Sequence, residues 1–209
     1  MFSLQTIFGK GDKFYGLLEA SAEAAHESAT ALVHMFSALP KASSLDEFVL
    51  ARKREKALTA QISQELVNTF VTALDREDIE ALSAALNKIT KAISKFAERY
   101  SLAADRLGDI DFATRAALLE KAAEVIKQMV GQLRKGMNLE AMTTLNDRMQ
   151  AIESEADRLL LELYRDLYGG RHEPIRILLL KDLFELLEKA IDRCRDAGNV
   201  AYQIVLKNS

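Results

Sequence analysis

The chain has 209 residues, of which 49% are hydrophobic and 28% are charged, and its net charge is −3. This balance is typical of a chain that folds around a core, and it argues against intrinsic disorder. The small negative charge offers no general attraction to nucleic acid or to an anionic bilayer. Nine glycines and two prolines are few turn residues for a β-rich fold of this length, so the composition favours helices.

Targeting signals and cysteine usage indicate a cytoplasmic protein. The first residues, MFSLQTIFGKGDKF, lack the apolar core and the small-residue cleavage site of a secretory signal. No stretch approaches the ~18 consecutive apolar residues that cross a membrane, so we expect no direct membrane insertion. The single cysteine, Cys194, cannot form an internal disulfide, and its helical surroundings predict a small buried side chain.

Six segments show the three-to-four-residue apolar spacing of amphipathic helices. In the first, this spacing runs up to Pro40, which ends the segment. In the second, Leu58, Ile62, Leu66 and Phe70 recur every four residues, which predicts a helix that includes Phe70. The expected helices cover about 12–39, 45–73, 75–106, 112–135, 139–168 and 174–206.

The signals at the segment ends agree with this division. In the motif LDRED, Asp75 precedes a helix whose first turn contains Asp78. Gly136 follows the fourth helix, and Pro174 stands in the first turn of the sixth. Because the connections are short, consecutive helices should pack antiparallel. The sequence therefore predicts an all-α fold, an elongated bundle of about six long helices.

The second and third helices look like a diverged copy of the fifth and sixth. Phe70 aligns with Leu167, and Leu86 aligns with Leu187 when the connection absorbs the difference in length. The simplest architecture for this order is a single domain built from two related three-helix units. The domain would cover 1–209, with halves at about 12–106 and 111–207.

Paired carboxylates mark the fifth and sixth helices. In IESEAD, Glu153 and Asp157 are four residues apart, and Glu188 and Asp192 repeat that spacing in ELLEKAIDRCRD. Like charges at this spacing share a helix face and repel by a few tenths of a kcal/mol (roughly 0.2–0.5) unless something compensates them. If the connection is centred near residue 171, Asp157 comes level with Glu185 in the antiparallel partner. The sequence therefore predicts one carboxylate site that a divalent or iron-type metal ion could occupy.

The same residues also fit a solvated charged face. Lys181 and Lys189 lie one turn to either side of Glu185 and could neutralise it. The Glu-x-x-His element of di-iron helical bundles is missing from the chain. From spacing alone, a metal site and a charged surface both remain open.

The chain resembles the divergent branch of the PhoU-like family, helical proteins associated with inorganic phosphate transporters and called Pit accessory proteins. The resemblance covers nearly the whole chain and rests on DKFYGLLEASAEAA, FVTALDREDIEALSAALNKI, IESEAD and ELLEKAIDRCRDAGNVAYQIVLKN. It implies a PhoU-type fold of two related three-helix units and a homo-oligomer. It also implies that the binding partner is a membrane phosphate transporter or a signalling protein.

The resemblance further implies metal binding through Glu/Asp-x-x-x-Asp motifs in each repeat. The second half keeps this pattern, whereas the first half has replaced it with Lys56, Ala60, Asn87 and Lys91. Two lysines and an alanine cannot hold a cation, so at most one of the two family sites is expected here. The residues carried over to that site are Glu153, Asp157, Glu185, Glu188 and Asp192.

Catalytic machinery is not evident in the sequence. The chain has no Gly-rich phosphate loop, no nucleophile elbow and no Ser-His-Asp or Cys-His arrangement, so we expect no enzymatic activity. The leading hypothesis is an accessory or regulatory protein of inorganic phosphate uptake that acts through protein–protein binding. Two alternatives stay open: a metal-binding or metal-dependent helical bundle unrelated to transport, and a structural helical module that oligomerises.

Overall fold

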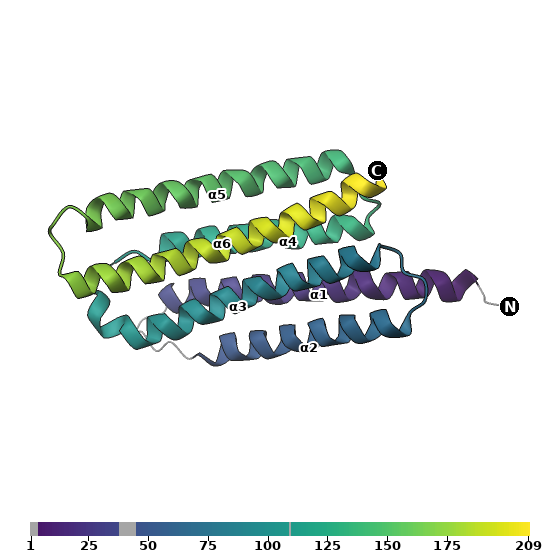
Figure 1. The fold of residues 1–209 in the computed structure, drawn as a ribbon, viewed down its shortest axis with the longest axis horizontal. Helices are drawn as coiled ribbons and strands as arrows, with labels where there is room; N and C mark the ends of the chain where they lie inside the picture. The colour runs from purple at the N-terminus through teal and green to yellow at the C-terminus, as the bar shows by residue number, and fades with distance from the viewer. Residues whose placement is uncertain (1–3, 38–44, 109) are drawn as a thin grey trace.

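The computed structural model describes residues 4–37, 45–108 and 110–209, and those residues form six helices and no strands (Figure 1). This confirms the predicted all-α fold. The helices are α1 (Leu4–Ser37), α2 (Asp46–Asn68), α3 (Arg76–Leu107), α4 (Ala113–Arg134), α5 (Leu139–Leu167) and α6 (Pro174–Asn208).

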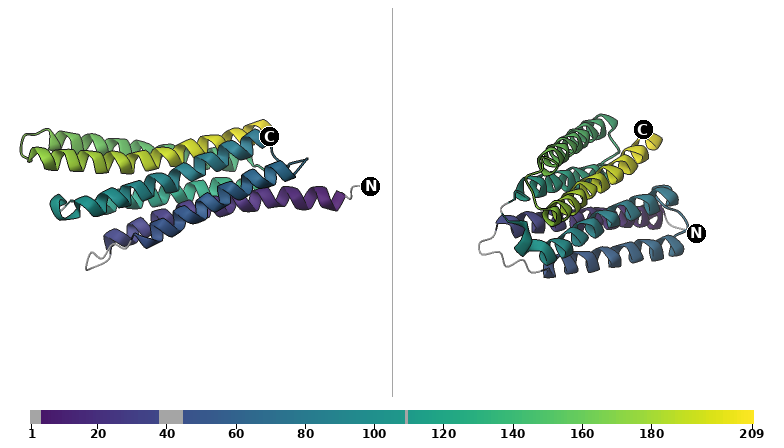
Figure 2. Two further views of the ribbon diagram at one scale, coloured as in Figure 1. Left: turned by 60° about the horizontal axis from the view of Figure 1, so that its bottom comes forward. Right: turned by 60° about the vertical axis from the view of Figure 1, so that its left-hand side comes forward.

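Four helices form the centre of the bundle, and two cover its flanks. Among the described residues, α1, α3, α6 and α4 make a closed ring of contacts, in which α3 packs against α6 and α1 against α4. By contrast, α2 contacts only α1 and α3, and α5 contacts only α4 and α6. All six helices run along a common long axis, which gives the elongated bundle that the sequence predicts (Figure 2). The division into two related halves stays a prediction.

The centre is held by apolar stripes at helical spacing. Leu82, Leu86, Ile89 and Ile93 follow one another along α3, and all four are fully buried. On α6 the corresponding face includes the fully buried Leu187. Each such side chain contributes roughly 1.5–3 kcal/mol by leaving water. Cys194 is buried on the same helix, as the sequence predicts.

An aromatic cluster joins elements from both parts of the chain. The Phe112 ring stacks on Phe184 of α6 at a centroid distance of 4.5 Å and on Phe36 of α1 at 5.6 Å. Tyr100 of α3 meets both Phe36 and Phe112 edge-on. Aromatic pairs of this kind contribute about 0.5–1.5 kcal/mol beyond their burial. The cluster therefore fixes the segment before α4 against three other helices.

The helix ends follow most of the sequence signals. Asp75 is the N-cap residue of α3, although its side chain makes no capping hydrogen bond. Asn138 caps α5, because its Oδ1 accepts from the backbone N–H of Ala141 at 2.8 Å. Pro174 begins α6, and Gly136 has a φ of 101°, a conformation that glycine adopts without strain.

Two helix boundaries differ from the prediction. Helix α1 begins at Leu4 rather than near residue 12, and α2 ends at Asn68 rather than near residue 73. The prediction that Pro40 ends the first helix lies outside the described residues. The expectation that Phe70 belongs to the second helix is wrong, because Phe70 lies in the connection to α3 and its side chain is fully exposed.

The early end of α2 has a local cause. Thr69 is extended, with φ −111° and ψ 122°, so the helix cannot continue through it. The Arg76 guanidinium donates hydrogen bonds to the carbonyl oxygens of Leu66 and Thr69, which would otherwise lack partners at a helix C-terminus. A cation at this end also suits the helix dipole.

Candidate functional site

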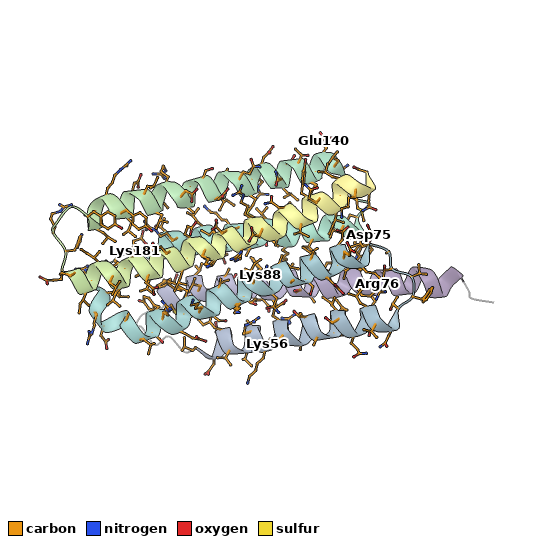
Figure 3. The ribbon with its side chains drawn as sticks, in the orientation of Figure 1. Lys56, Asp75, Arg76, Lys88, Glu140 and Lys181 are labelled. Atoms are coloured by element: carbon orange, nitrogen blue, oxygen red, sulfur yellow. The ribbon has the colours of Figure 1, made fainter. Side chains whose placement is uncertain are left out.

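Three of the five predicted carboxylates, Glu185, Glu188 and Asp192, line a groove between α5 and α6, which we call the α5–α6 groove. Its volume is about 670 Å³, and five acidic side chains of α6 line it together with three basic ones. The acidic residues are Asp182, Glu185, Glu188, Asp192 and Asp196, and the basic residues are Lys189, Arg193 and Arg195. The spacing of three and four residues places these side chains on one face of α6, because the helix turns once in 3.6 residues. Figure 3 marks the start of this face with Lys181.

Glu185 is held by a tyrosine and a lysine. The Tyr164 hydroxyl of α5 donates to Glu185 Oε1 at 2.5 Å, and Lys181 Nζ lies 2.6 Å from the same oxygen. The contact with Lys181, and then that with Tyr164, lowers the pKa of Glu185. Burial, followed by the Glu185 carboxylate, raises the pKa of Tyr164. Glu185 is therefore an ionised acceptor that positions Tyr164, whose ring stacks on Tyr168.

Glu188 and Asp192 form a carboxyl–carboxylate pair one turn further along α6. Partial burial, and then the charge of Asp192, raises the pKa of Glu188 from about 4.5 to about 7. The protonated Glu188 donates a hydrogen bond to Asp192, and burial raises the pKa of Asp192 as well. The charge of Asp157 contributes to both shifts. Near neutral pH, this pair therefore holds a proton that keeps two like charges from facing each other.

Glu153 pairs with a cation and does not join the Glu188–Asp192 pair. It forms an ion pair with Arg195 of α6, and 15% of its side chain is exposed. This contact, together with that between Tyr164 and Glu185, sets the register of the two helices. Asp157 is then level with Asp192, not with Glu185 as a connection centred near residue 171 would require. The connection, residues 168–173, is indeed centred near residue 171. The contacts Tyr164–Glu185 and Glu153–Arg195 nevertheless centre the pairing near residue 174, so side-chain contacts between the helices, and not the position of the connection, decide the register.

The five predicted ligands thus fall into three groups: Glu153 with Arg195; Glu185 with Lys181 and Tyr164; and Glu188 with Asp192 beside Asp157. In the described part of the chain, no group of three His, Cys, Asp or Glu side chains is placed to hold a metal ion. The side chains as they stand do not fit a metal ion, and metal binding by these residues stays a prediction.

Sequence reasoning missed two members of this site. Tyr164 is seven residues after Asp157, which puts it two turns further along α5. Arg195 follows Asp192 by three residues on α6, so its position on the groove could have been found from the same spacing. Neither contact is evident from one helix alone, because each depends on how α5 and α6 are aligned.

The contact between α2 and α3, which the predicted repeat would match to that between α5 and α6, has different chemistry. Asn87 accepts a hydrogen bond from Arg52 at 2.8 Å and donates one from Nδ2 to Thr59 Oγ1 at 2.7 Å. Lys56 and Lys91, predicted to replace the carboxylates, are exposed. A network centred on the Asn87 amide, with Arg52 as its only charged member, therefore stands between α2 and α3.

No helix among the described residues has the length and hydropathy that a membrane crossing requires. No protein-family model matches the chain. Two relatives match along almost its whole length. One, named "Putative pit accessory protein", from Rhizobium meliloti (strain 1021), is 22% identical over 201 residues, which cover 94% of each chain. The other, UPF0111 protein YkaA of Bacillus subtilis (strain 168), is 23% identical over 210 residues, 96% of this chain and 98% of that one.

Solved structures show the same architecture. A PhoU-like protein from Shewanella oneidensis MR-1 superposes with a TM-score of 0.79 at 17% identity, covering 92% of this chain and 96% of its own. A second structure from that organism, described as a "putative PhoU-like phosphate regulatory protein", gives a TM-score of 0.75 at 18% identity and covers 93% of this chain and 99% of its own. The chain therefore has the fold of these PhoU-like proteins. The resemblance that the sequence motifs indicate is confirmed by the two relatives and by the two structures.

Proposed function

We propose that this PhoU-like protein is an accessory or regulatory protein of inorganic phosphate uptake, and that it acts by binding a membrane phosphate transporter or a signalling partner. The observation that carries the proposal is the relation along 94% of both chains to the Rhizobium protein named as a pit accessory protein. The PhoU-like fold supports it, because a related fold is found in a protein described as phosphate regulatory.

The chemistry of the side chains supports a role in binding rather than catalysis. Cys194 is completely buried, and burial strongly raises the pKa of its thiol, so no reactive thiolate is presented. In the α5–α6 groove, Glu185 and Glu153 are bound by cations, and Glu188 and Asp192 by one another. These groups can recognise charge on a partner, but they do not form a nucleophile and base.

Phosphate uptake in cells tests this proposal directly. Deleting the gene should change the rate of radiolabelled phosphate uptake, and the wild-type gene on a plasmid should restore it. Tagged protein should also co-purify with the inorganic phosphate transporter from detergent-solubilised membranes. Unchanged uptake in the deletion strain, with no co-purification, would contradict the proposal.

A second, narrower proposal is that the α5–α6 groove takes up one divalent or iron-type metal ion. The supporting feature is the closeness of Glu188 and Asp192 to each other and to Asp157, because a cation between them could replace the proton that relieves their repulsion. Further donors would become available only if Glu153 or Glu185 left its cation. Elemental analysis of protein purified without chelator should find near-stoichiometric metal, and less in Asp157→Asn/Asp192→Asn. Wild-type protein free of metal would rule the site out.

Self-association also remains a proposal, inherited from the family resemblance. Light scattering of the purified chain should give a mass above the 23.3 kDa of one chain. A monomeric mass at all protein concentrations would rule out self-association and would leave the proposed role in phosphate uptake unaffected.

A further inference from the structure

The last turn of α2 and its connection to α3 present three apolar side chains to solvent. Phe70 is 101% exposed, Val67 78% and Val71 56%. We call these three residues the α2–α3 tip. Single exposed aliphatic residues are common on protein surfaces, but a fully exposed phenylalanine between two exposed valines is a local apolar surface. Aromatic residues are enriched in the cores of protein interfaces, so this surface has the composition of a contact site.

The backbone of the tip is held in place. Arg76 donates a hydrogen bond to the Thr69 carbonyl at 2.8 Å and another to that of Leu66. Thr72 Oγ1 donates to the Leu74 carbonyl at 2.7 Å, and the Thr69 and Leu74 side chains are buried. Because the segment is anchored on both sides of Phe70, binding a partner there costs little ordering of the backbone.

Acidic residues surround the tip. From residue 61 to residue 80 the chain carries five acidic residues and a single arginine. Two of the acids are paired: Glu65 with Lys13, and Asp78 with Lys207, each at 2.6 Å. Asp75 and Glu77 are exposed next to the tip, and Figure 3 places Asp75 and Arg76 where the chain enters α3. Lys207 also lies near Asp75 and Glu77. Because the five acids outnumber Arg76, Lys13 and Lys207, the tip is an apolar surface with a net acidic border.

We infer that the α2–α3 tip docks into an apolar depression bordered by lysine and arginine on the cytoplasmic face of the membrane transporter; this rests on the function proposed above. Cytoplasmic loops of membrane proteins carry an excess of Lys and Arg, which complements the acidic border. The same border disfavours a bare anionic bilayer, because lipid headgroups would repel Asp75 and Glu77. Phe70 supplies the apolar anchor, and the acids set the orientation.

The test is binding to proteoliposomes that contain the inorganic phosphate transporter, with protein-free anionic vesicles of the same lipids as reference. Phe70→Ser should weaken binding by about tenfold or more, as expected for a buried aromatic anchor. The matched control is Leu102→Ser, because Leu102 is also exposed, at 87%, and lies roughly 40 Å further along α3. We expect it to change the affinity less than about twofold. Both substitutions remove exposed side chains, so thermal unfolding should show that both variants fold.

Charge reversal tests the border separately. Glu77→Lys should weaken binding at low salt, and its difference from wild type should shrink as salt is raised, because exposed charges are screened. Wild-type affinity for Phe70→Ser would overturn the docking site and leave the proposed function standing. Equal binding of the wild type to protein-free vesicles would overturn it in favour of a lipid surface. A wild type that binds neither preparation would overturn both the docking site and the transporter-binding role.

Discussion

The helix pairs α2–α3 and α5–α6, which the predicted repeat would match to one another, satisfy their polar groups in different ways. In the first, the Asn87 amide accepts from Arg52 and donates to Thr59. In the second, Glu188 and Asp192 face one another and share a proton near neutral pH. A network centred on a neutral amide does not titrate near neutral pH, whereas a carboxyl pair responds to protons and cations. Of these two sites, the α5–α6 groove is therefore the one whose charge changes near neutral pH.

The first half also contains an acid whose pKa is raised to near neutral pH. This acid, Glu55, faces α1 and not α3. Glu55 is fully buried between α2 and α1, where the Ser21 hydroxyl donates to its Oε1 at 2.6 Å. Burial raises the pKa of Glu55 from about 4.5 to about 7. In the first half, the acid with the raised pKa, Glu55, is buried between two helices. In the second half, Glu188 and Asp192 line a groove that is open to solvent. Four substitutions test this contrast, from the largest expected effect to the smallest.

Glu55→Gln should remove the strongest pH dependence of stability. The folded-state pKa of Glu55 is raised, so its carboxyl is protonated in the folded protein at low pH, and stability is lost as pH rises from about 4.5 through about 7. That loss is up to about 3 kcal/mol, from about 1.4 kcal/mol per pKa unit. Denaturant unfolding at pH 5 and pH 8 measures it. Glu55→Gln should be the more stable protein at pH 8, and Glu80→Gln, at an exposed position, is the control. An unchanged pH dependence in Glu55→Gln would show that Glu55 is ionised without cost.

Asn87→Ala should open the amide network between α2 and α3. It leaves Arg52 and Thr59 without their partner, at a cost of about 1–2 kcal/mol. Unlike the loss at Glu55, this cost should be the same at pH 5 and pH 8. Lys88→Ala, at the exposed neighbouring position, should stay within about 0.5 kcal/mol of wild type. Equal effects of the two substitutions in urea unfolding would argue against the network.

Glu188→Gln should reduce the pH dependence of stability that arises from the Glu188–Asp192 pair in the α5–α6 groove. The pKa of Glu188 is raised to about 7, so the wild type loses stability as pH rises from about 4.5 to 7, and the glutamine variant avoids this loss. Because Glu188 is only partly buried, solvent screening reduces the gain to about 1 kcal/mol at pH 8. At pH 5 the variant and wild type should be nearly equal. A carboxyl titration by NMR that places Glu188 near 4.5 would contradict the shared proton.

Tyr164→Phe should produce the smallest change. It removes the hydroxyl that donates to Glu185, and we expect a loss of about 0.5 kcal/mol because the contact is partly exposed. Its clearer signature is the pKa of Glu185, which should rise once the Tyr164 hydrogen bond is gone. Tyr168→Phe keeps the contact and is the matched control. If the NMR titration of Glu185 is identical in Tyr164→Phe and Tyr168→Phe, the hydrogen bond from Tyr164 does not stabilise the Glu185 carboxylate.

Local periodicity made most of the fold predictable. The apolar spacing along α3, and the glycines and proline at the helix ends, identify the six helices because they reflect 3.6 residues per turn. The same spacing puts Glu188 and Asp192 on one face of α6. Phe70 shows where this reasoning fails: it continues the apolar stripe of α2, yet it lies beyond the helix end and aligns with the buried Leu167 only in sequence.

The sequence by itself determined the six helices, their amphipathic faces and the resemblance to PhoU-like proteins, because each depends on residues close together in the chain or on whole motifs. Only the tertiary structure decided that Glu153 meets Arg195, that Asp157 lies level with Asp192 and that Glu55 is buried. Each of these depends on the register between two helices, which is set by how side chains pack. A shift of one turn moves a side chain along the partner helix by about 5.4 Å, enough to exchange one partner for another.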